Sequence, residues 1–244
     1  MLLLRTTAPV FDAHCYVIAA AEGGDALVVD PGAGAADGVA ELLERYRLGV
    51  GAVVLTHAHA DHVWDAAAVA GPAPVYVAAP DLYRLDDPAA ALGEPLATTF
   101  LQLAGTPWRR PETVVPLPSA TLAGGGGLLV PGVVVRALPA PGHTEGSTVL
   151  LVRGEVDAPR LLPADVAPDD DGTHLLALCG DVVFARSVGR TDLPGGDERE
   201  MSATLRTLVR ALPPTTVLLP GHGAVSLLSR ERTTNPYLRD VLGR

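Results

Sequence analysis

Four apolar runs of this chain end in the same way, in histidine or aspartate, and this recurrence constrains the fold more than any other feature. The runs are VVLT, ALPAPG, LALCG and VLLPG, and each reads as a strand with its following turn. They lead into seven ionisable residues, which are His57, His59, Asp61, His62, His143, Asp181 and His222. Because open sheets bind ligands beyond the carboxyl ends of their strands, we expect all of these side chains to form one site.

Glycine directly precedes three of these residues, at Gly142, Gly180 and Gly221. Glycine has no Cβ, so the backbone can bend sharply or approach an ion closely at these points. The histidine count supports the same interpretation, because five of the seven histidines in the chain fall in the set.

Imidazole and carboxylate together suit Zn²⁺, with Fe²⁺ or Mn²⁺ as alternatives. A lone H-x-H pair or a lone Asp after a strand has other common roles, so the inference rests on the whole set. Seven donors are too many for one tetrahedral ion. The sequence therefore predicts two adjacent divalent ions, with one carboxylate reaching both.

The rest of the chain alternates short apolar runs with Gly/Pro-rich turns. Predicted strands cover 15–20, 26–30, 51–56, 74–78, 133–139, 147–153, 174–179 and 216–220, and predicted helices cover 35–49, 62–70 and 197–212. We expect 81–112 to be irregular and 154–173 to be an exposed excursion that lines or shades the groove. Several strands are apolar on both faces, which favours a layered α/β arrangement within one domain, 1–244.

Composition narrows the partners and the location. The net charge is −10 and all 18 basic residues are Arg, which argues against nucleic acid as a partner. No run approaches the ~18 apolar residues of a membrane span, and MLLLRTTAPVF is too short in its apolar part for a signal peptide. We expect a cytoplasmic protein without a disulfide between Cys15 and Cys179. The absence of Lys, with abundant Ala, Gly and Pro, indicates GC-rich bacterial coding.

The motif His57-x-His59-x-Asp61-His62, followed by PGHT, GD and PGHG, resembles the metallo-β-lactamase superfamily. The segments GRTDLPGGD (189–197) and ERTTNPYL (231–238) look like the small bacterial glyoxalase II-like hydrolases. The resemblance implies a four-layer αββα sandwich with metals in a groove at one edge. It also implies a first ion on His57, His59 and His143, a second ion on Asp61, His62 and His222, and Asp181 as the bridge.

The activity that the resemblance implies is hydrolysis of a thioester by a metal-bridging hydroxide, which Asp61 helps to orient. No G-x-S-x-G nucleophile motif occurs. Arg190 either attracts an anionic substrate tail or pairs with Asp192. One rival is a persulfide dioxygenase with a single Fe²⁺, and His222 and LPGGD favour the hydrolase over it. A lactonase and a zinc-stabilised binding module are further alternatives.

Several residues depart from the family pattern. His14 stands where the family commonly has Asn, and we expect it and Cys179 to be structural. We expect Trp64 and Asp65 to pack the helix start or shape the groove wall. Because 22 residues follow His222, we expect the chain to lack the C-terminal helical domain of full-length glyoxalase II. The acyl group, the thiol carrier and the choice between monomer and homodimer therefore stay open.

Overall fold

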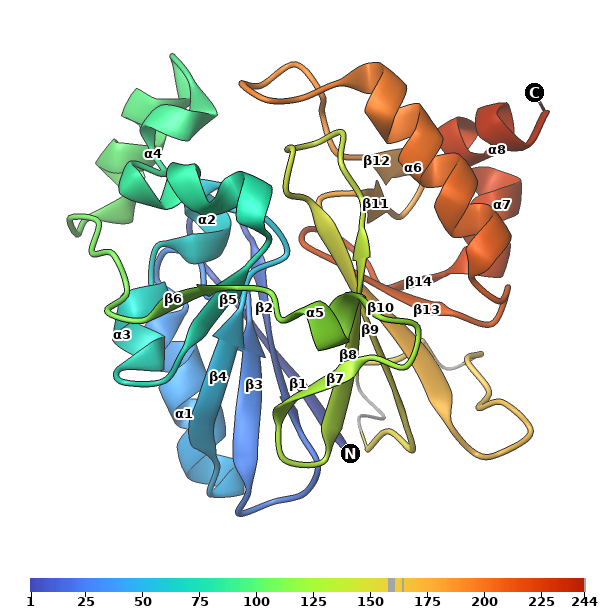
Figure 1. The fold of residues 1–244 in the computed structure, drawn as a ribbon, viewed down its shortest axis with the longest axis horizontal. Helices are drawn as coiled ribbons and strands as arrows, with labels where there is room; N and C mark the ends of the chain where they lie inside the picture. The colour runs from blue at the N-terminus through green and yellow to red at the C-terminus, as the bar shows by residue number, and fades with distance from the viewer. Residues whose placement is uncertain (158–160, 164, 244) are drawn as a thin grey trace.

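The computed structural model describes residues 1–157, 161–163 and 165–243 (Figure 1). Two six-stranded β-sheets pack face to face, and helices cover the outer face of each sheet. This is the layered α/β arrangement that the sequence predicts and the four-layer αββα sandwich that the family resemblance implies.

The first sheet uses its strands in chain order. They are β1 (Leu2–Thr7), β2 (His14–Ala19), β3 (Asp25–Val29), β4 (Gly49–Val54), β5 (Val75–Val77) and β6 (Val114–Pro116). Strands β1 to β3 are antiparallel, and β3 to β6 are parallel. Helices α1 (Ala36–Tyr46) and α3 (Ala66–Ala70) lie on its outer face. The parallel strands direct their carboxyl ends to one edge, where β4 leads into His57.

The second sheet has the order β14-β13-β10-β9-β8-β7. Its strands are β7 (Gly127–Val130), β8 (Val133–Pro139), β9 (Thr148–Gly154), β10 (His174–Gly180), β13 (Val217–Pro220) and β14 (Ser226–Leu227). Helices α6 (Glu198–Ala211), α7 (Leu228–Thr234) and α8 (Pro236–Gly243) cover it. Because β10 and β13 are parallel, Asp181 and His222 emerge at the same edge.

The apolar core has a layer between the sheets and a layer under each set of helices. Ile18, Val54, Leu150 and Leu219 are among the fully buried side chains between the sheets. Helix α6 confirms the prediction for 197–212. The Asp197 carboxylate caps this helix by accepting hydrogen bonds from the amides of Arg199 and Glu200. The buried residues of α6 recur with helical spacing.

The prediction that 81–112 is irregular is wrong. The segment contains most of η1 (Ala79–Asp86) together with η2 (Ala90–Leu92) and α4 (Leu96–Ala104). Helix α4 is fixed by burial of Ala97 and Phe100, and the Phe100 ring contacts the Trp64 ring at 4.9 Å between centroids. Helix α4 is short and follows Pro95, so its sequence shows too little helical periodicity to predict it. Tertiary packing decides its conformation instead. The short elements α2 (Ala60–Val63), α5 (Ser119–Leu122), β11 (Val183–Phe184) and β12 (Ser187–Val188) complete the fold.

The predicted excursion 154–173 joins β9 to β10, and its residues 158–160 and 164 lie outside the described residues. The described part leads into the start of β10 at His174, whereas Asp181 follows the other end of that strand. Asp165 in this part pairs with Arg230 at 2.6 Å. The prediction that the excursion shades the groove is therefore wrong for its described residues. Within the described ranges, no helix combines the length and the apolar character needed to cross a bilayer.

Candidate metal centre

The loop after β4 and the short helix α2 supply four of the candidate ligands from six consecutive positions, 57–62. The chain is extended at His59, which begins the short helix, so His57 and His59 precede the helix while Asp61 and His62 lie in its only turn. All four side chains are buried. The change from extended to helical backbone turns the two pairs toward different partners from the second sheet.

The predicted ligands form two groups of side chains whose donor atoms lie within 4.8 Å of one another. The first group consists of His57, His59 and His143. The second group consists of Asp61, His62 and His222. These are the two sets that the family resemblance implies.

Asp181 lies between the two groups. Its Oδ1 is 3.3 Å from His62 Nε2, and its Oδ2 is 3.7 Å from His143 Nε2 and 3.5 Å from His222 Nε2. A carboxylate with one or both oxygens near each group is placed where a bridging ligand would have to be.

The nitrogens of the first group face one another. His59 Nδ1 lies 2.9 Å from His143 Nε2, and two imidazole lone pairs face each other in this way only with a proton or a cation between them. His57 Nε2 is buried and has no hydrogen-bond partner in the part of the chain that the structure describes. Ligand atoms around a tetrahedral ion with bonds of ~2.0–2.1 Å lie about 3.3 Å apart, close to this spacing. The donor set therefore fits a metal ion.

The second group combines carboxylates and imidazoles. His62 Nε2 is 3.2 Å from His222 Nε2, and Asp61 Oδ2 is 3.3 Å from the same His222 nitrogen. Asp61 and Asp181 are two nearly buried carboxylates within reach of the same histidine. Such closely spaced buried carboxylates require positive charge between them, which a divalent ion supplies.

The two groups differ in protonation. Burial and the neighbouring histidines lower the pKa of His57 well below its usual range and that of His59 to about 3, so both are neutral ligands at neutral pH. Burial acts in the same direction on His62 and His222. There, however, the carboxylates of Asp61 and Asp181 outweigh burial and raise the pKa of both histidines. The carboxylates beside the second group therefore favour protonation of His62 and His222, whereas His57 and His59 favour the neutral form.

Hydrogen bonds from the far side of each ring fix the nitrogen that faces the centre. His143 donates from Nδ1 to the Arg190 carbonyl at 2.7 Å, and His62 donates from Nδ1 to Asp30 Oδ2 at 3.2 Å. His57 Nδ1 lies 3.1 Å from Thr56 Oγ1, whose hydroxyl donates to Asp30 Oδ2 at 2.6 Å. In His57, His62 and His143, Nε2 is therefore left for the metal, as is usual for metal-binding histidines.

Asp30 is a site residue that the sequence analysis missed. It is buried, and it orients His62 directly and His57 through Thr56. The available signal was the run ALVVD, a fifth apolar strand that ends in an ionisable residue. An Asp before Pro and Gly resembles an ordinary turn residue, which concealed its role.

His14 and Cys179 have structural contacts. The His14 amide donates to the Gly221 carbonyl at 2.7 Å, and its ring donates from Nδ1 to the Pro220 carbonyl at 3.2 Å. Burial, with Arg5 nearby, lowers the pKa of His14 to about 4, so its ring is neutral. Burial raises the pKa of the Cys179 thiol to about 12, which leaves it protonated and unreactive. Both predictions of a structural role agree with these contacts.

The glycines before the ligands are sites of close approach. A Cβ at Gly180, where φ is +46°, would lie 2.2 Å from Thr56 Oγ1. A Cβ at Gly221 would lie 2.3 Å from Asp181 Oδ1. Any side chain at these positions would displace the groups that carry or orient the ligands.

Arg190 lies on the rim with its guanidinium paired to Asp192 through two hydrogen bonds of 2.7 Å each. About half of its side chain is exposed. The structure thus shows the ion-pair alternative for Arg190. In the tail, Asn235 donates to the carbonyls of Phe184 and Ser187 and so ties α7 and α8 to the hairpin that follows Asp181.

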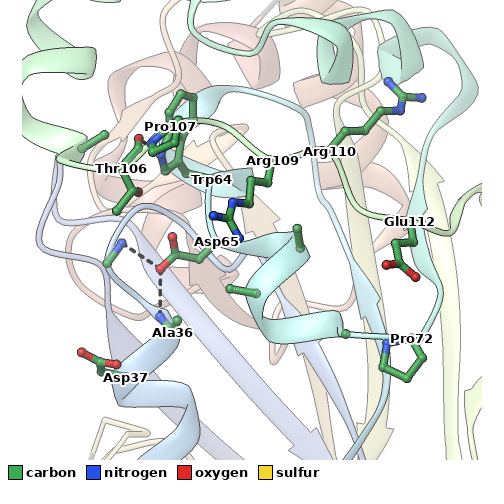
Figure 2. Close-up of a pocket in the computed structure, with 15 residues that line it drawn as sticks. Ala36, Asp37, Trp64, Asp65, Pro72, Thr106, Pro107, Arg109, Arg110 and Glu112 are labelled. Carbon is green, nitrogen blue, oxygen red and sulfur yellow. Dashed lines mark hydrogen bonds between the residues drawn. The ribbon is translucent and has the colours of Figure 1, made fainter.

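A separate pocket of about 820 Å³ lies beside the motif (Figure 2). Trp64 and Asp65 line it, together with the start of α1, the helix α3 and residues 104–112. The Asp65 carboxylate accepts from the amides of Gly34 and Ala36 at 2.9 and 3.0 Å, so it supports the start of α1 and not that of the helix predicted at 62–70. None of the seven candidate ligands lines this pocket.

The chain belongs to the metallo-β-lactamase superfamily, whose family model matches residues 8–157. An uncharacterized protein of Mycobacterium tuberculosis is 36% identical over 243 residues, which cover 99% of both chains. A hydroxyacylglutathione hydrolase of Haemophilus influenzae is 26% identical over 220 residues, 88% of this chain and 87% of that protein.

Solved structures share the whole fold. A B3 metallo-β-lactamase, BLEG-1, superposes with a TM-score of 0.72 at 25% identity and covers 97% of this chain and 99% of its own. TTHA1623 in a di-iron-bound form superposes with a TM-score of 0.69 at 27% identity, over 96% of this chain and 99% of its own. The metallo-β-lactamase fold predicted from the motif is confirmed.

Proposed function

We propose that this metallo-β-lactamase superfamily member is a dinuclear metal-dependent hydrolase that cleaves a thioester. The observation that carries the proposal is the position of Asp181, with oxygens 3.3–3.7 Å from histidines of both donor groups. Support for a thioester comes from the similarity to a hydroxyacylglutathione hydrolase and from the segment GRTDLPGGD.

The residues fit two divalent ions, with zinc favoured and iron or manganese as alternatives. His57, His59 and His143 would hold the first, Asp61, His62 and His222 would hold the second, and Asp181 would contact both. When bound, such ions lower the pKa of water to about 7 and polarise a carbonyl, which supplies both the nucleophile and the electrophile of hydrolysis.

The chain's own residues orient these parts. The hydrogen bonds from His143 to the Arg190 carbonyl and from His62 to Asp30 fix the two rings before substrate arrives. The Asp61 carboxylate, in the second donor group, would accept a proton or a hydrogen bond from the attacking hydroxide or water and so orient it. The leaving group is a thiolate whose conjugate thiol has a pKa of about 8.5, so the reaction requires no strong general acid.

The substrate would enter over the rim that Arg190 occupies. Because the Arg190–Asp192 pair is exposed, a substrate carboxylate can replace Asp192 at small cost. The proposed partner is therefore a small thioester with an anionic tail. The enzyme would act in the cytoplasm as a monomer or homodimer, and neither nucleic acid nor a membrane would be its partner.

Metal analysis and a substrate panel test the proposal. Protein purified without added metal should carry two ions per chain and hydrolyse hydroxyacylglutathione or the thioester of another thiol. His59→Ala should remain folded and lose this activity, whereas His174→Ala, which changes a histidine outside the centre, should keep it. One iron per chain with oxygen uptake on a persulfide would refute the proposal. Hydrolysis of β-lactams or lactones without any thioester activity would also refute it.

A further inference from the structure

Asp81, in η1, is a fully buried carboxylate that belongs to neither donor group. Its Oδ2 accepts from the Ala58 amide at 2.9 Å and from the Thr144 hydroxyl at 2.8 Å. Its Oδ1 accepts from the Gly146 amide at 2.8 Å and from Arg84 Nε at 3.3 Å. Four donors from three separate segments thus converge on one side chain.

Three of these donors, Ala58, Thr144 and Gly146, belong to the loops that supply the first donor group. Ala58 stands between His57 and His59, and Thr144 directly follows His143. Asp81 therefore joins a loop of the first sheet to a loop of the second sheet at the ends where their histidines meet. The fit is close, since a Cβ at Gly146 would lie 2.5 Å from Asp81 Cγ.

The second donor group has other supports. Asp30 holds His62, and the hydroxyl of Tyr16 donates at 2.8 Å to the carbonyl of Pro220, two positions before His222. In the described part of the chain, no hydrogen bond of Asp81 reaches Asp61, His62 or His222. Asp81 therefore supports the loops of the first donor group and not the residues of the second.

Arg84 extends the network to the loop 189–197. It is 1% exposed, and its Nη2 donates to the Pro194 carbonyl at 2.8 Å and to the Glu145 carboxylate. A Cβ at Gly195 would lie 2.1 Å from the same Nη2. The loop it holds also carries Arg190, on the rim where the substrate is proposed to enter.

We propose that Asp81 is a positioning residue for the first metal ion and that Arg84 is a positioning residue for the substrate loop 189–197. The assignment of Asp81 needs only the metal centre, whereas that of Arg84 rests on the proposed thioester hydrolysis. Asp81→Asn replaces one accepting oxygen with an NH2 group. Since each oxygen accepts from two donors, two of the four donors would then lie against N–H groups that cannot accept. The loops must separate, and metal ligands tolerate displacements of only about 0.2 Å.

The test of Asp81 is a competition titration of the ion-free full chain with zinc against a chromophoric chelator, which resolves two dissociation constants. His59→Ala and His222→Ala each remove one ligand and assign these constants to the two ions. In Asp81→Asn the first ion should bind about 10- to 100-fold more weakly and the second within about threefold of wild type. Asp87→Asn is the matched control, because Asp87 is exposed in the same segment and accepts one amide at 3.0 Å. Equal weakening of both ions, or of neither, would overturn the assignment.

Thr144→Val keeps the test decisive if Asp81→Asn does not fold. It removes a single donor to Asp81 and should weaken the first ion alone by about three- to tenfold. Amide hydrogen exchange gives a measurement without metal, because Ala58 and Gly146 should exchange faster in ion-free Asp81→Asn than in wild type. Unchanged exchange at both amides would contradict the proposed contacts.

Arg84→Lys tests the second half of the proposal. Lysine keeps the charge but loses the fork that reaches Pro194 and Glu145 together. Because Arg84 Nε also donates to Asp81, the first zinc ion should bind at most about tenfold more weakly, and the second should stay within about threefold of wild type. At saturating zinc, KM for the thioester should rise about fivefold with kcat nearly unchanged. Loss of metal, or an unchanged KM, would overturn it. A wild-type protein that binds two ions without hydrolysing any thioester would refute the proposed function and leave the Asp81 test intact.

Discussion

Gly221→Ala would introduce one methyl group into the metal centre. The added Cβ would lie 2.3 Å from Asp181 Oδ1 and 2.6 Å from His62 Cε1. Gly221 itself has no left-handed backbone angle, so the substitution acts through these contacts and adds no backbone strain. It therefore measures how accurately the two ligands must be placed.

The required movement follows from the distances. Ordinary van der Waals contact begins at 3.4 Å, so the Asp181 oxygen would have to move by about 1.1 Å along the line to the Cβ, or the loop would have to retreat by as much. Metal ligands tolerate about 0.2 Å. A misplacement of about 1 Å at a reacting centre lowers rates about 100-fold, and overpacking of this kind destabilises by about 1–3 kcal/mol.

We expect Gly221→Ala to remain folded, to lose at least one of its two ions and to lose hydrolysis about 100-fold or more. Elemental analysis, a urea unfolding curve and initial rates on the same preparation measure these effects. Gly124→Ala is the control, because a Cβ there meets nothing within 4 Å. Two ions per chain with activity within threefold of the control would refute the reasoning.

Three further predictions concern other parts of the molecule. Asp30→Asn should weaken both ions about 10- to 100-fold, because Asp30 orients His62 directly and His57 through Thr56; the zinc titration measures this, and selective loss of one ion would contradict it. Because the ion-free centre raises the pKa of His62 and His222, binding of the second ion must release protons, and its affinity should fall as the pH is lowered. Zinc titrations at about pH 6 and pH 8 with a pH indicator check this, and equal pH dependence for both ions would contradict it. Leu150→Ala should lower the free energy of unfolding by about 2–5 kcal/mol in urea melts without changing metal content, and a loss below about 1 kcal/mol would count against the inter-sheet core.

The clustering of the candidate ligands could be predicted from the sequence because their segments follow strands. His57, His143 and Asp181 lie far apart in the chain, but parallel and neighbouring strands bring their ends to one edge. The same regularity predicted the layered fold, and helix α6 carried both a cap at Asp197 and a helical period. Local chemistry and topology pointed to the same result at these places.

The supporting residues could not be predicted in this way. Asp81 acts on Ala58 and Thr144, and these contacts join positions 23 and 63 residues away, with no periodic pattern linking them. Asp30 resembled a turn residue, and α4 became a helix through burial of Phe100. In each case the determining partner is distant in sequence, so only the folded structure reveals it.

The order in which the centre can be assembled follows from the separation of its ligands. His62 and His222 are 160 positions apart, and β10 pairs in parallel with β13 only after the whole α6 crossover has formed. Parallel pairing across such distances is slow, because a long loop must close before the contacts form. During synthesis the first four ligand residues emerge long before His222, so a complete binding site exists only after nearly the whole chain has left the ribosome. Full occupancy by two ions is therefore a signature of a chain that has finished folding.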